Sequence, residues 1–468
     1  MDSGDICGII DRHRIAFAFF LLGICNNYAY FIMFSAAEDI VNGNERNFNR
    51  VPTTTFTTKK YFTTSTTKQY FIATTPSDDE EYKSRHFFEK LLSSNASDKC
   101  HENVVCRKCT TTSIHAGIVV MCNALPAFFV QFLFAYFVDK IPFVIKHFLI
   151  CCLQIGAYLA VGFSTSIVTS LIGVVLASIG VGLGEITYPH LPSYNSKKNK
   201  SAWSIGTGIS GLIASIIYAV LTEPNLLNLS PKIAFMVMQT VPSIFVVTYW
   251  IIPSESSGIN QICTWNNSNK NIQFDHNSST FYSNDNFNSR NSNDSELLNK
   301  FLKVVFSLPI TFPLIIGYCF EHIINQGLTP LIAFDCSNGL HLSKASQYRW
   351  YQSIYHSGVS FSRLVSKIIK LPCFWFLYLP LVLQALNVLL FTYEALNCFI
   401  PSILIIFAII CYEGIIGGLT YANTYHEISE KYGGNEKKTV SCFTKNISKF
   451  AVGLSGIASY FLHNFICN

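Results

Sequence analysis

The chain is 468 residues long; 50% of its residues are hydrophobic and only 13% are charged. Soluble domains average about 25% charged residues, so this composition is typical of an integral membrane protein, with the lipid bilayer as its first partner. The formal net charge of +5 is small for this length. No basic patch interleaved with aromatic residues occurs, so we expect no nucleic-acid partner.

Six apolar runs that are long enough to span a bilayer precede the middle of the chain. They cover about residues 15–37, 113–138, 141–163, 166–190, 202–222 and 231–252. The segment between the first two runs, residues 38–110, is polar and rich in threonine, which predicts a lumenal loop without regular structure. We therefore predict an N-terminal six-helix half over residues 1–252.

The predicted lumenal loop carries one plausible glycosylation sequon, at Asn95. It also contains Cys100, Cys106 and Cys109. Their spacing is a weak signal for zinc, and one disulfide with a third thiol left over is the favoured alternative. We therefore predict a glycoprotein without a metal site.

Residues 253–301 are rich in asparagine and serine, which predicts a flexible cytoplasmic linker. Near its end, Asp294, Leu297 and Leu298 have the DxxLL form that is used in endosomal and lysosomal sorting, so sorting adaptors are possible partners. The alternative is that the two leucines merely begin the seventh helix.

Five further apolar runs define a C-terminal half over residues 302–468. They cover about residues 302–334, 346–366, 373–393, 400–425 and 440–466. Lysines are concentrated in the connections on one side of the predicted spans. By the positive-inside rule, this asymmetry places the N-terminus in the cytoplasm and, because the number of spans is odd, the C-terminus in the lumen.

The two halves repeat short motifs in the same order. The repeated motifs are Gly-x-Ser-Gly at 208–211 and 453–456, a glutamate beside several glycines at Glu185 and Glu413, and a polar pair at 26–27 and 325–326. Repeated halves around a midplane site are typical of transporters. We therefore predict an all-α polytopic membrane protein, a major-facilitator-like bundle of about 11 transmembrane helices in two pseudo-repeat halves.

Several predicted spans carry polar side chains where lipid tolerates few of them. The eighth span has Arg349, Gln352, His356 and Arg363 at i, i+3, i+7 and i+14, on one helical face. In the seventh span, Glu321 lies one turn before the polar pair. Intramembrane charges usually face the bundle interior and mark a pathway, so we predict a central translocation site.

Each of these charges also has a structural interpretation. Glu185 can be a helix-end carboxylate that reaches water or a lysine such as Lys197. Glu321 can form a structural ion pair with Arg349 or Arg363. If the arginines instead face an open cavity, their planar guanidinium groups suit phosphate or carboxylate.

Glu413 lies deeper in its span, with Gly417, Tyr421 and Thr424 following on the same face. A carboxyl group buried there can exchange a proton, so we expect possible proton coupling. No metalloprotease, hydrolase or phosphate-loop motif occurs in the sequence. We therefore expect neither an enzyme nor a cofactor.

Several stretches carry a family resemblance. They are residues 21–40, 173–187, 203–212, 324–328, 347–355 and 400–428, with the motifs CNNxxY, GLGE, QYRWYQ and YEGxxGG. Over essentially all the spans the chain resembles the battenin family, lysosomal membrane proteins of the ceroid-lipofuscinosis group. The resemblance fails only in the loop and the linker.

This resemblance implies a multi-pass protein of the lysosomal or late endosomal membrane that is related to the major facilitator superfamily. The family is linked to clearance of glycerophosphodiesters, to lysosomal pH and to basic amino-acid handling. By position, its motif residues carry over to Asn26, Asn27, Glu185, Glu321, Asn325, Gln326, Arg349, Glu413 and Asn423. One departure is the pair Lys445 and Lys449 in the last span, where animal relatives are more neutral.

We therefore expect a transporter that exports small polar metabolites, glycerophosphodiesters first, from the lysosome and influences lysosomal pH. Arg349 or Arg363 would meet the phosphate, and Glu185, Glu321 or Glu413 would meet an amine or carry a proton. The first alternative is transport of arginine or lysine across the lysosomal or vacuolar membrane. The second is a non-transporting scaffold for lysosomal trafficking and pH regulation.

Overall fold

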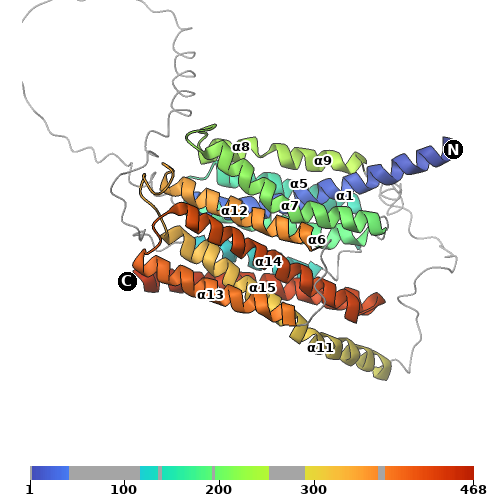
Figure 1. Cartoon of the computed structure of the whole chain (residues 1–468). Coiled ribbons are helices and arrows are strands. Elements are labelled where there is room, and N and C mark those ends of the chain that lie inside the picture. Colours follow the sequence, from blue (N-terminus) through green and yellow to red (C-terminus); the bar gives the residue numbers. More distant parts are fainter. Residues whose placement is uncertain are drawn as a thin grey trace, which may run out of the picture.

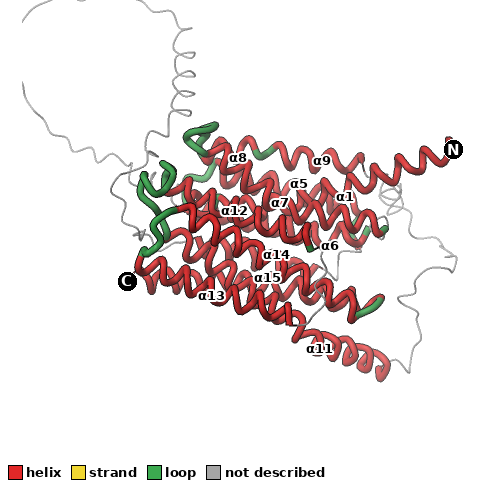
Figure 2. The backbone as a smooth tube through the Cα atoms, in the orientation of Figure 1, coloured by secondary structure: helices red, strands yellow, loops and turns green. Residues whose placement is uncertain are grey.

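The long helices lie roughly parallel and form one bundle, in which α1 begins at one end and α15 finishes at the other (Figure 1). We call these the N end and the C end of the bundle. The computed structural model describes residues 3–41, 116–134, 140–191, 196–251, 290–366 and 375–467. Within them it contains helices and no β-strand. Several of the loops that connect the helices gather at the C end (Figure 2).

The helices follow one another with few short elements between them. The first part of the chain forms α1 (Ser3–Ser35), α4 (Ala116–Phe134), α5 (Phe143–Gly162), α6 (Ile167–Thr187), α7 (Lys197–Thr222), α8 (Pro231–Val237) and α9 (Thr240–Ile251). The second part forms α11 (Arg290–His322), α12 (Lys344–Val365), α13 (Trp375–Asn397), α14 (Ile403–Lys431) and α15 (Gly434–Cys467). Short helical turns are η2 (Tyr188–His190), η4 (Ile323–Leu328) and η5 (Thr329–Leu331).

Each predicted span corresponds to helix in the part of the chain that the structure describes. Ten helical segments among these residues are long and apolar enough to cross a bilayer. The remaining predicted span is α12, which is too polar to meet that criterion but lies in the bundle against α7 and α14. The sixth span is divided, because a turn at Met238 separates α8 from α9.

Serine side chains define where two of the helices begin. The Ser166 hydroxyl accepts a hydrogen bond from the Thr169 backbone N–H at the start of α6. The Ser343 hydroxyl accepts one from the Ser346 N–H at the start of α12. Each cap satisfies a backbone donor that has no partner within its own helix, which favours helix initiation at that point.

The helices pair in the same way in the two halves. In the first half, α1 packs against α7, and α6 packs against α4 and α5. In the second half, α11 packs against α15, and α14 packs against α12 and α13. Each half thus pairs its first span with its fifth, and its fourth with its second and third. The predicted major-facilitator-like bundle of two pseudo-repeat halves is confirmed.

Two helix pairs make the most extensive contacts between the halves: α4 with α15, and α7 with α12. Where α4 meets α15, a Cβ atom added at Gly117 would lie 2.7 Å from the Gly456 carbonyl oxygen. A Cβ atom added at Gly456 would lie 2.5 Å from the Gly117 carbonyl oxygen. Only glycine allows the two backbones to approach this closely, as at many interfaces between membrane helices.

The connecting segments differ from the prediction in two places. The predicted lumenal loop begins too early, because residues 37–41 are helical and Glu38 is buried. The predicted linker ends too late, because α11 begins at Arg290 and so includes the backbone of Asp294, Leu297 and Leu298. The predicted sorting role of that motif stays a prediction.

Several predictions fall on residues outside the described part of the chain. They concern the sequon at Asn95 and the cysteines Cys100, Cys106 and Cys109. The boundaries of the two halves, at 252 and 302, also stay predictions.

Candidate substrate-translocation site

Charged groups lie along one face of α14 at three successive helical turns. Glu413, Gly417 and Tyr421 follow one another at intervals of four residues, so they lie in a row along this face. Glu413 belongs to α14 itself, Glu321 of α11 meets the row at Gly417, and Arg363 of α12 meets it at Tyr421. We call Glu413, Glu321 and Arg363 the α14 charge row.

The Glu413 carboxyl group is fully buried among neutral amides. Its Oε1 accepts hydrogen bonds from Asn325 Nδ2 at 2.9 Å and from Gln384 Nε2 at 3.2 Å. Its Oε2 has no hydrogen-bond partner, and no cation among the described residues forms an ion pair with it. Burial disfavours the charged form of such a group, so this site can hold a proton.

Glu321 reaches α14 because position 417 has no side chain. A Cβ atom at Gly417 would lie 2.8 Å from Glu321 Oε2. Glu321 is only 7% exposed, and within the described residues its carboxylate makes no hydrogen bond or ion pair. The ion pair considered for Glu321 with Arg349 or Arg363 is therefore not formed in this structure.

Arg363 lies over the ring of Tyr421, with Cζ 4.2 Å from the ring centroid, a distance suited to a cation–π interaction. Its Nε atom is buried without a hydrogen-bond partner. Gly417 and Tyr421 are four residues apart, so Glu321 and Arg363 contact residues that lie about one helical turn apart on α14.

Amide side chains from η4 and α12 connect to the Glu413 end of the row. Gln352 Nε2 donates to the Asn325 carbonyl at 3.1 Å, and Gln326 Nε2 donates to Gln352 Oε1 at 3.2 Å. η4 is a π-helical turn, a feature that frequently occurs at functional sites. The predicted residues Asn325, Gln326 and Gln352 therefore lie together beside Glu413.

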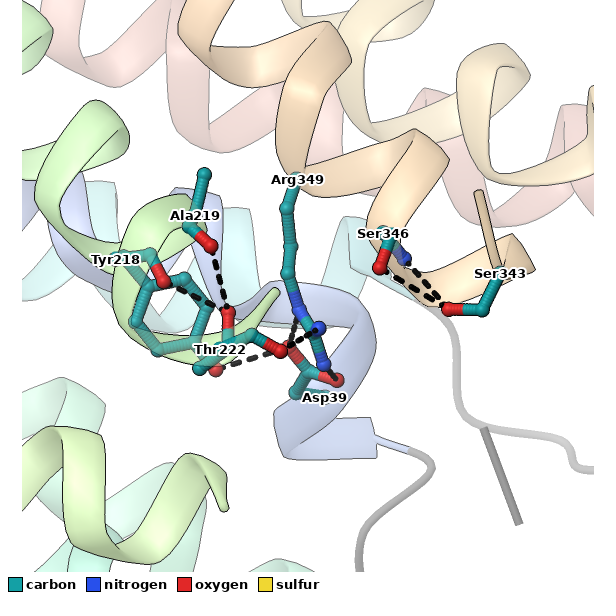
Figure 3. A network of polar contacts seen from close by, with 7 residues as sticks. All are labelled: Asp39, Tyr218, Ala219, Thr222, Ser343, Ser346 and Arg349. Carbon is teal, nitrogen blue, oxygen red and sulfur yellow. Dashed lines mark hydrogen bonds and ion pairs between the residues drawn. The ribbon is translucent and has the colours of Figure 1, made fainter. Parts of the chain in front are cut away.

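Arg349 lies apart from the row and is held by a carboxylate (Figure 3). Its Nε and Nη2 donate to Asp39 Oδ2 and Oδ1 at 2.8 and 2.7 Å, and Nη1 donates to the Thr222 carbonyl at 3.2 Å. The Tyr218 hydroxyl donates to the same carboxylate at 2.9 Å. The Arg349 and Asp39 side chains are 3% and 8% exposed. The guanidinium group thus forms a buried ion pair that joins α12 to the helical residues 37–41, which follow α1.

Further hydrogen bonds support this contact between the halves. The Trp350 indole N–H donates to Glu223 Oε2 at 3.0 Å, and the Tyr348 hydroxyl donates to the Phe34 carbonyl at 3.1 Å. The halves are therefore joined through α12 by side chains from several consecutive positions.

Glu185, which lies near the end of α6, is also ion-paired. Its Oε2 forms ion pairs with Lys449 and, at 3.2 Å, with Lys445, both on α15. Gln131 Nε2 of α4 donates to the same oxygen. The lysine alternative predicted for Glu185 is right in kind, but the partners are Lys445 and Lys449 instead of Lys197.

Asn26 on α1 occupies the place in the first half that Asn325 occupies in the second. Its Nδ2 donates to the Val181 carbonyl of α6 at 3.3 Å, and a Cβ atom at Gly184 would collide with its Oδ1. Asn26 thus faces the fourth span of its half, as Asn325 faces Glu413 in the tenth. The first members of the two predicted polar pairs, Asn26 and Asn325, therefore face corresponding helices.

The remaining predicted site residues do not belong to the α14 charge row. Asn27 donates to the Gly23 carbonyl of its own helix at 3.3 Å. His356 packs against Phe31 with the ring centroids 5.0 Å apart, and its Nε2 has no hydrogen-bond partner. Asn423 is buried, and its Nδ2 also lacks a partner.

Two residues that define these sites, Asp39 and Gln384, are not among the predicted site residues. Asp39 follows the first apolar run directly and was assigned to the loop. A carboxylate at the end of a span can pair with an arginine in another span, but the sequence does not indicate which arginine. Gln384 is an isolated glutamine within the apolar ninth span, which is also a recognisable signal for a buried polar contact.

The sequence matches a known family over nearly its whole length. The model of the family described as CLN3 protein matches residues 17–468. Battenin of Canis lupus familiaris is 29% identical over 462 residues, which cover 96% of this chain and 90% of that protein. Protein btn-1 of Neurospora crassa is 28% identical over 385 residues, which cover 76% of this chain and 82% of that protein.

Solved transporter structures share the fold at low sequence identity. A D-xylose-proton symporter matches with a TM-score of 0.53 at 10% identity, covering 97% of this chain and 95% of that chain. A bacterial homolog of the human lysosomal transporter Spinster, inward-facing and unoccupied, matches with a TM-score of 0.51 at 11% identity, covering 96% and 81%. These matches show a common architecture.

Proposed function

Because the chain belongs to the CLN3 protein family, we propose that it is a transporter in the membrane of lysosomes, late endosomes or vacuoles. It exports small polar metabolites, glycerophosphodiesters first, by alternating access between its two halves, and thereby influences lysosomal pH. The observation that carries this proposal is the α14 charge row, in which two buried carboxyl groups and one partly buried arginine, from three helices, meet without pairing with one another.

Two other ion pairs in the same molecule support this interpretation of the row. Asp39 with Arg349, and Glu185 with Lys449, are largely buried charges joined by direct contacts, and the more exposed Lys445 also pairs with Glu185. Charges that serve only packing are expected to be paired, because an unpaired buried charge is strongly unfavourable. Unpaired charges inside a membrane bundle are therefore better explained by a ligand that supplies their missing partners.

We also place proton coupling at Glu413. This carboxyl group is fully buried, accepts two amide hydrogen bonds on one oxygen and leaves the other without a partner. It lies one turn from the position where Glu321 meets α14. A proton that moves on and off Glu413 would therefore change the charge beside the substrate, which links proton and substrate movement.

The test is uptake by proteoliposomes that contain the purified full-length protein. We expect saturable uptake of labelled glycerophosphocholine that an acid gradient changes and that excess arginine does not inhibit. Flux of arginine without flux of the phosphodiester would replace this proposal with the basic amino-acid alternative. That alternative is favoured by one observation: the row contains two carboxyl groups and one guanidinium group.

Absence of any flux from folded protein would favour the scaffold alternative instead. Removal of residues 254–289, which precede α11, separates the two classes. A transporter keeps its flux without them, whereas a scaffold that acts through partners on this segment loses its effect on trafficking and lysosomal pH. A control replaces the segment with a Gly/Ser chain of equal length.

A further inference from the structure

We propose that α13 provides a path for protons from the C end of the bundle to Glu413, through the interior of the second half. The path consists of Gln384, Asn387 and Glu394, which we call the α13 polar stripe. The hydroxyl group of Tyr351 on α12 completes it. This inference rests on the proposed function and deepens its proton-coupling step, because it assigns proton movement to residues outside the α14 charge row.

The α13 polar stripe lies on the buried face of its helix. Gln384, Asn387 and Glu394 are 2%, 6% and 1% exposed. Their spacings of three and seven residues put them on one side of the helix, along a rise of about 15 Å. Another face of α13 carries exposed apolar side chains such as Leu386 and Leu389. The polar groups therefore face the protein and the apolar groups face lipid, as expected for a polar path inside a membrane bundle.

This buried face belongs to the interior of the second half. The main partners of α13 are α11, α14 and η4, all of the second half. Figure 1 shows α13 on the side of the bundle opposite α8 and α9 of the first half. A path along α13 therefore does not follow the boundary between the halves, where access to the substrate alternates.

Each member of the stripe has a buried polar atom without a hydrogen-bond partner among the described residues. These atoms are Gln384 Oε1, Asn387 Nδ2 and Glu394 Oε1. The Tyr351 hydroxyl oxygen and Glu413 Oε2 are in the same situation. Buried polar groups of this kind are usually satisfied by internal water. A row of such donors and acceptors suits water molecules that pass a proton from one group to the next.

Gln384 forms the inner end of the path. Its Nε2 donates to Glu413 Oε1 at 3.2 Å, and Asn387 follows about one turn later on the same face of α13. The carboxyl group of Glu321 meets α14 one turn from Glu413, at Gly417. A proton that arrives along α13 therefore reaches Glu413 on the side opposite to none of its partners but through Gln384, and from there it changes the charge next to Glu321.

Glu394 forms the outer end. Its Oε2 accepts hydrogen bonds from the backbone N–H groups of Phe399 and Ile400 at 3.1 and 3.0 Å. No cation of the described residues pairs with this carboxyl group. α13 ends within one turn, at Asn397, and Phe399 is 49% exposed at the C end of the bundle. Glu394 therefore lies just inside the protein surface, where it can take up a proton from this end.

Tyr351 connects the two ends of the stripe. Between Asn387 and Glu394, the buried face of α13 carries the apolar ring of Phe391. Tyr351 packs in the same cluster as Phe391 and Ala395. A phenol hydroxyl group both donates and accepts a hydrogen bond, so it can pass a proton around the Phe391 ring. The ionisable groups that face the stripe are thus Tyr351 of α12 and Glu413 of α14.

The test separates proton movement from substrate movement in proteoliposomes that contain the full-length protein. The gradient response is the ratio of glycerophosphocholine uptake rates with and without an acid gradient. Substrate exchange without a gradient is measured by counterflow. Asn387→Leu puts an apolar side chain of similar volume in the path, so it should remove the gradient response and retain counterflow. Asn387→Ser keeps a polar group and should retain both.

Glu394→Gln tests the outer end. Glutamine still offers an oxygen to the Phe399 and Ile400 N–H groups, so we expect the variant to fold. It cannot exchange a proton, so it should lose the gradient response and retain counterflow. The matched control is Thr392→Val on the same helix, because the Thr392 hydroxyl only donates to the Val388 carbonyl of α13 at 2.7 Å. This control should behave as the wild type does.

A wild-type gradient response in both Asn387→Leu and Glu394→Gln would overturn the α13 path and leave the proposed function intact. Parallel losses of gradient response and counterflow in Asn387→Leu, with no rescue by Asn387→Ser, would assign Asn387 to packing and also overturn the path. A wild-type protein that transports without any gradient response would overturn the proposed proton coupling. A folded wild-type protein without any flux would overturn the proposed function itself.

Discussion

Gly417 shows how one missing side chain determines the position of a charge. A Cβ atom added at residue 417 would lie only 2.8 Å from Glu321 Oε2, so the carboxylate occupies space that a side chain would need. The same helix face carries Glu413 one turn before and Tyr421 one turn after. A small residue at this position is therefore a requirement of the α14 charge row as well as of helix packing.

Gly417→Ala should accordingly displace the Glu321 carboxylate and reduce glycerophosphocholine uptake about tenfold, since the new methyl group occupies its place. The measurement is initial uptake rate in proteoliposomes at matched protein content. Gly208→Ala on α7 is the control, because an added Cβ there meets nothing within 4 Å. Alanine is favoured over glycine within helices, so this control should fold at least as well as the wild type. Unchanged uptake in Gly417→Ala would contradict the role assigned to Glu321.

Glu413→Gln should separate transport from its proton dependence. Glutamine keeps an oxygen that can accept from Asn325 and Gln384, so we expect the variant to fold. It cannot exchange a proton, so uptake should continue down a substrate gradient but no longer respond to an acid gradient. The measurement is the ratio of uptake rates with and without that gradient. A ratio equal to that of the wild type would exclude Glu413 as the proton site.

For single residues, the sequence predicts which side chains belong to the sites better than it predicts which residues they contact. Polar residues within apolar runs identify Glu321, Arg363 and Glu413, because lipid tolerates few charges. The partner of Arg349 could not be predicted in this way, since Asp39 is 310 positions away and lies beyond the predicted end of the first span. Which charges pair depends on how the helices cross, and that information is not contained in hydropathy.

Among the elements, α12 is the helix whose polarity the fold explains. It faces both α7 of the other half and α14 of its own, so little of its surface remains for lipid. Arg349 lies near its beginning and Arg363 near its end. The first joins the halves and the second belongs to the α14 charge row, so one helix contributes to both sites.

The Asp39–Arg349 pair should stabilise the fold only as a pair. Asp39→Asn or Arg349→Gln alone leaves a buried charge without its partner, which typically costs about 3–5 kcal/mol. We expect each single variant to lower the melting temperature in detergent more than the double variant does. The coupling follows from a double-mutant cycle.

The exposed pair Lys303 with Glu436 provides the comparison for this cycle. Surface ion pairs contribute roughly 0–1 kcal/mol, so its single and double variants should all melt near the wild type. Losses that simply add for Asp39→Asn and Arg349→Gln would show that the two charges do not stabilise each other.

Hydropathy predicted the helices well, because each span must bury or shield its backbone groups. It failed at their ends. The extension of α11 back to Arg290 lies in a sequence rich in asparagine and serine, which carries no apolar signal. The helical residues 37–41 lie among the charges of Glu38 and Asp39, which are buried by contacts with the other half and with neighbouring helices.

For the whole molecule, disulfides support the predicted orientation. Cys336, Cys398 and Cys467 are disulfide-bonded and lie at the C end of the bundle, where Cys336 and Cys398 follow η5 and α13 and Cys467 ends α15. Disulfides persist in oxidising compartments. An oxidising compartment at the C end would agree with the lumenal side that the distribution of lysines predicts, and the orientation stays a prediction.

Cysteine labelling in intact vacuoles or lysosomes tests this orientation. Gly433→Cys, in the exposed turn between α14 and α15 at the N end, should react with a membrane-impermeant maleimide from outside. Leu226→Cys, which replaces a 56% exposed residue in the loop after α7 at the C end, should react only after permeabilisation. The reverse pattern would invert the assignment.

Alternating access between two halves is the central claim, and counterflow measures it most directly. Proteoliposomes filled with unlabelled glycerophosphocholine are placed in a trace of the labelled compound, without any acid gradient. A transporter that exposes the α14 charge row to each side in turn exchanges one for the other, so we predict a transient internal excess of label that Arg363→Gln abolishes. Label that enters folded wild-type proteoliposomes no faster than protein-free vesicles, and without a transient excess, would contradict the account.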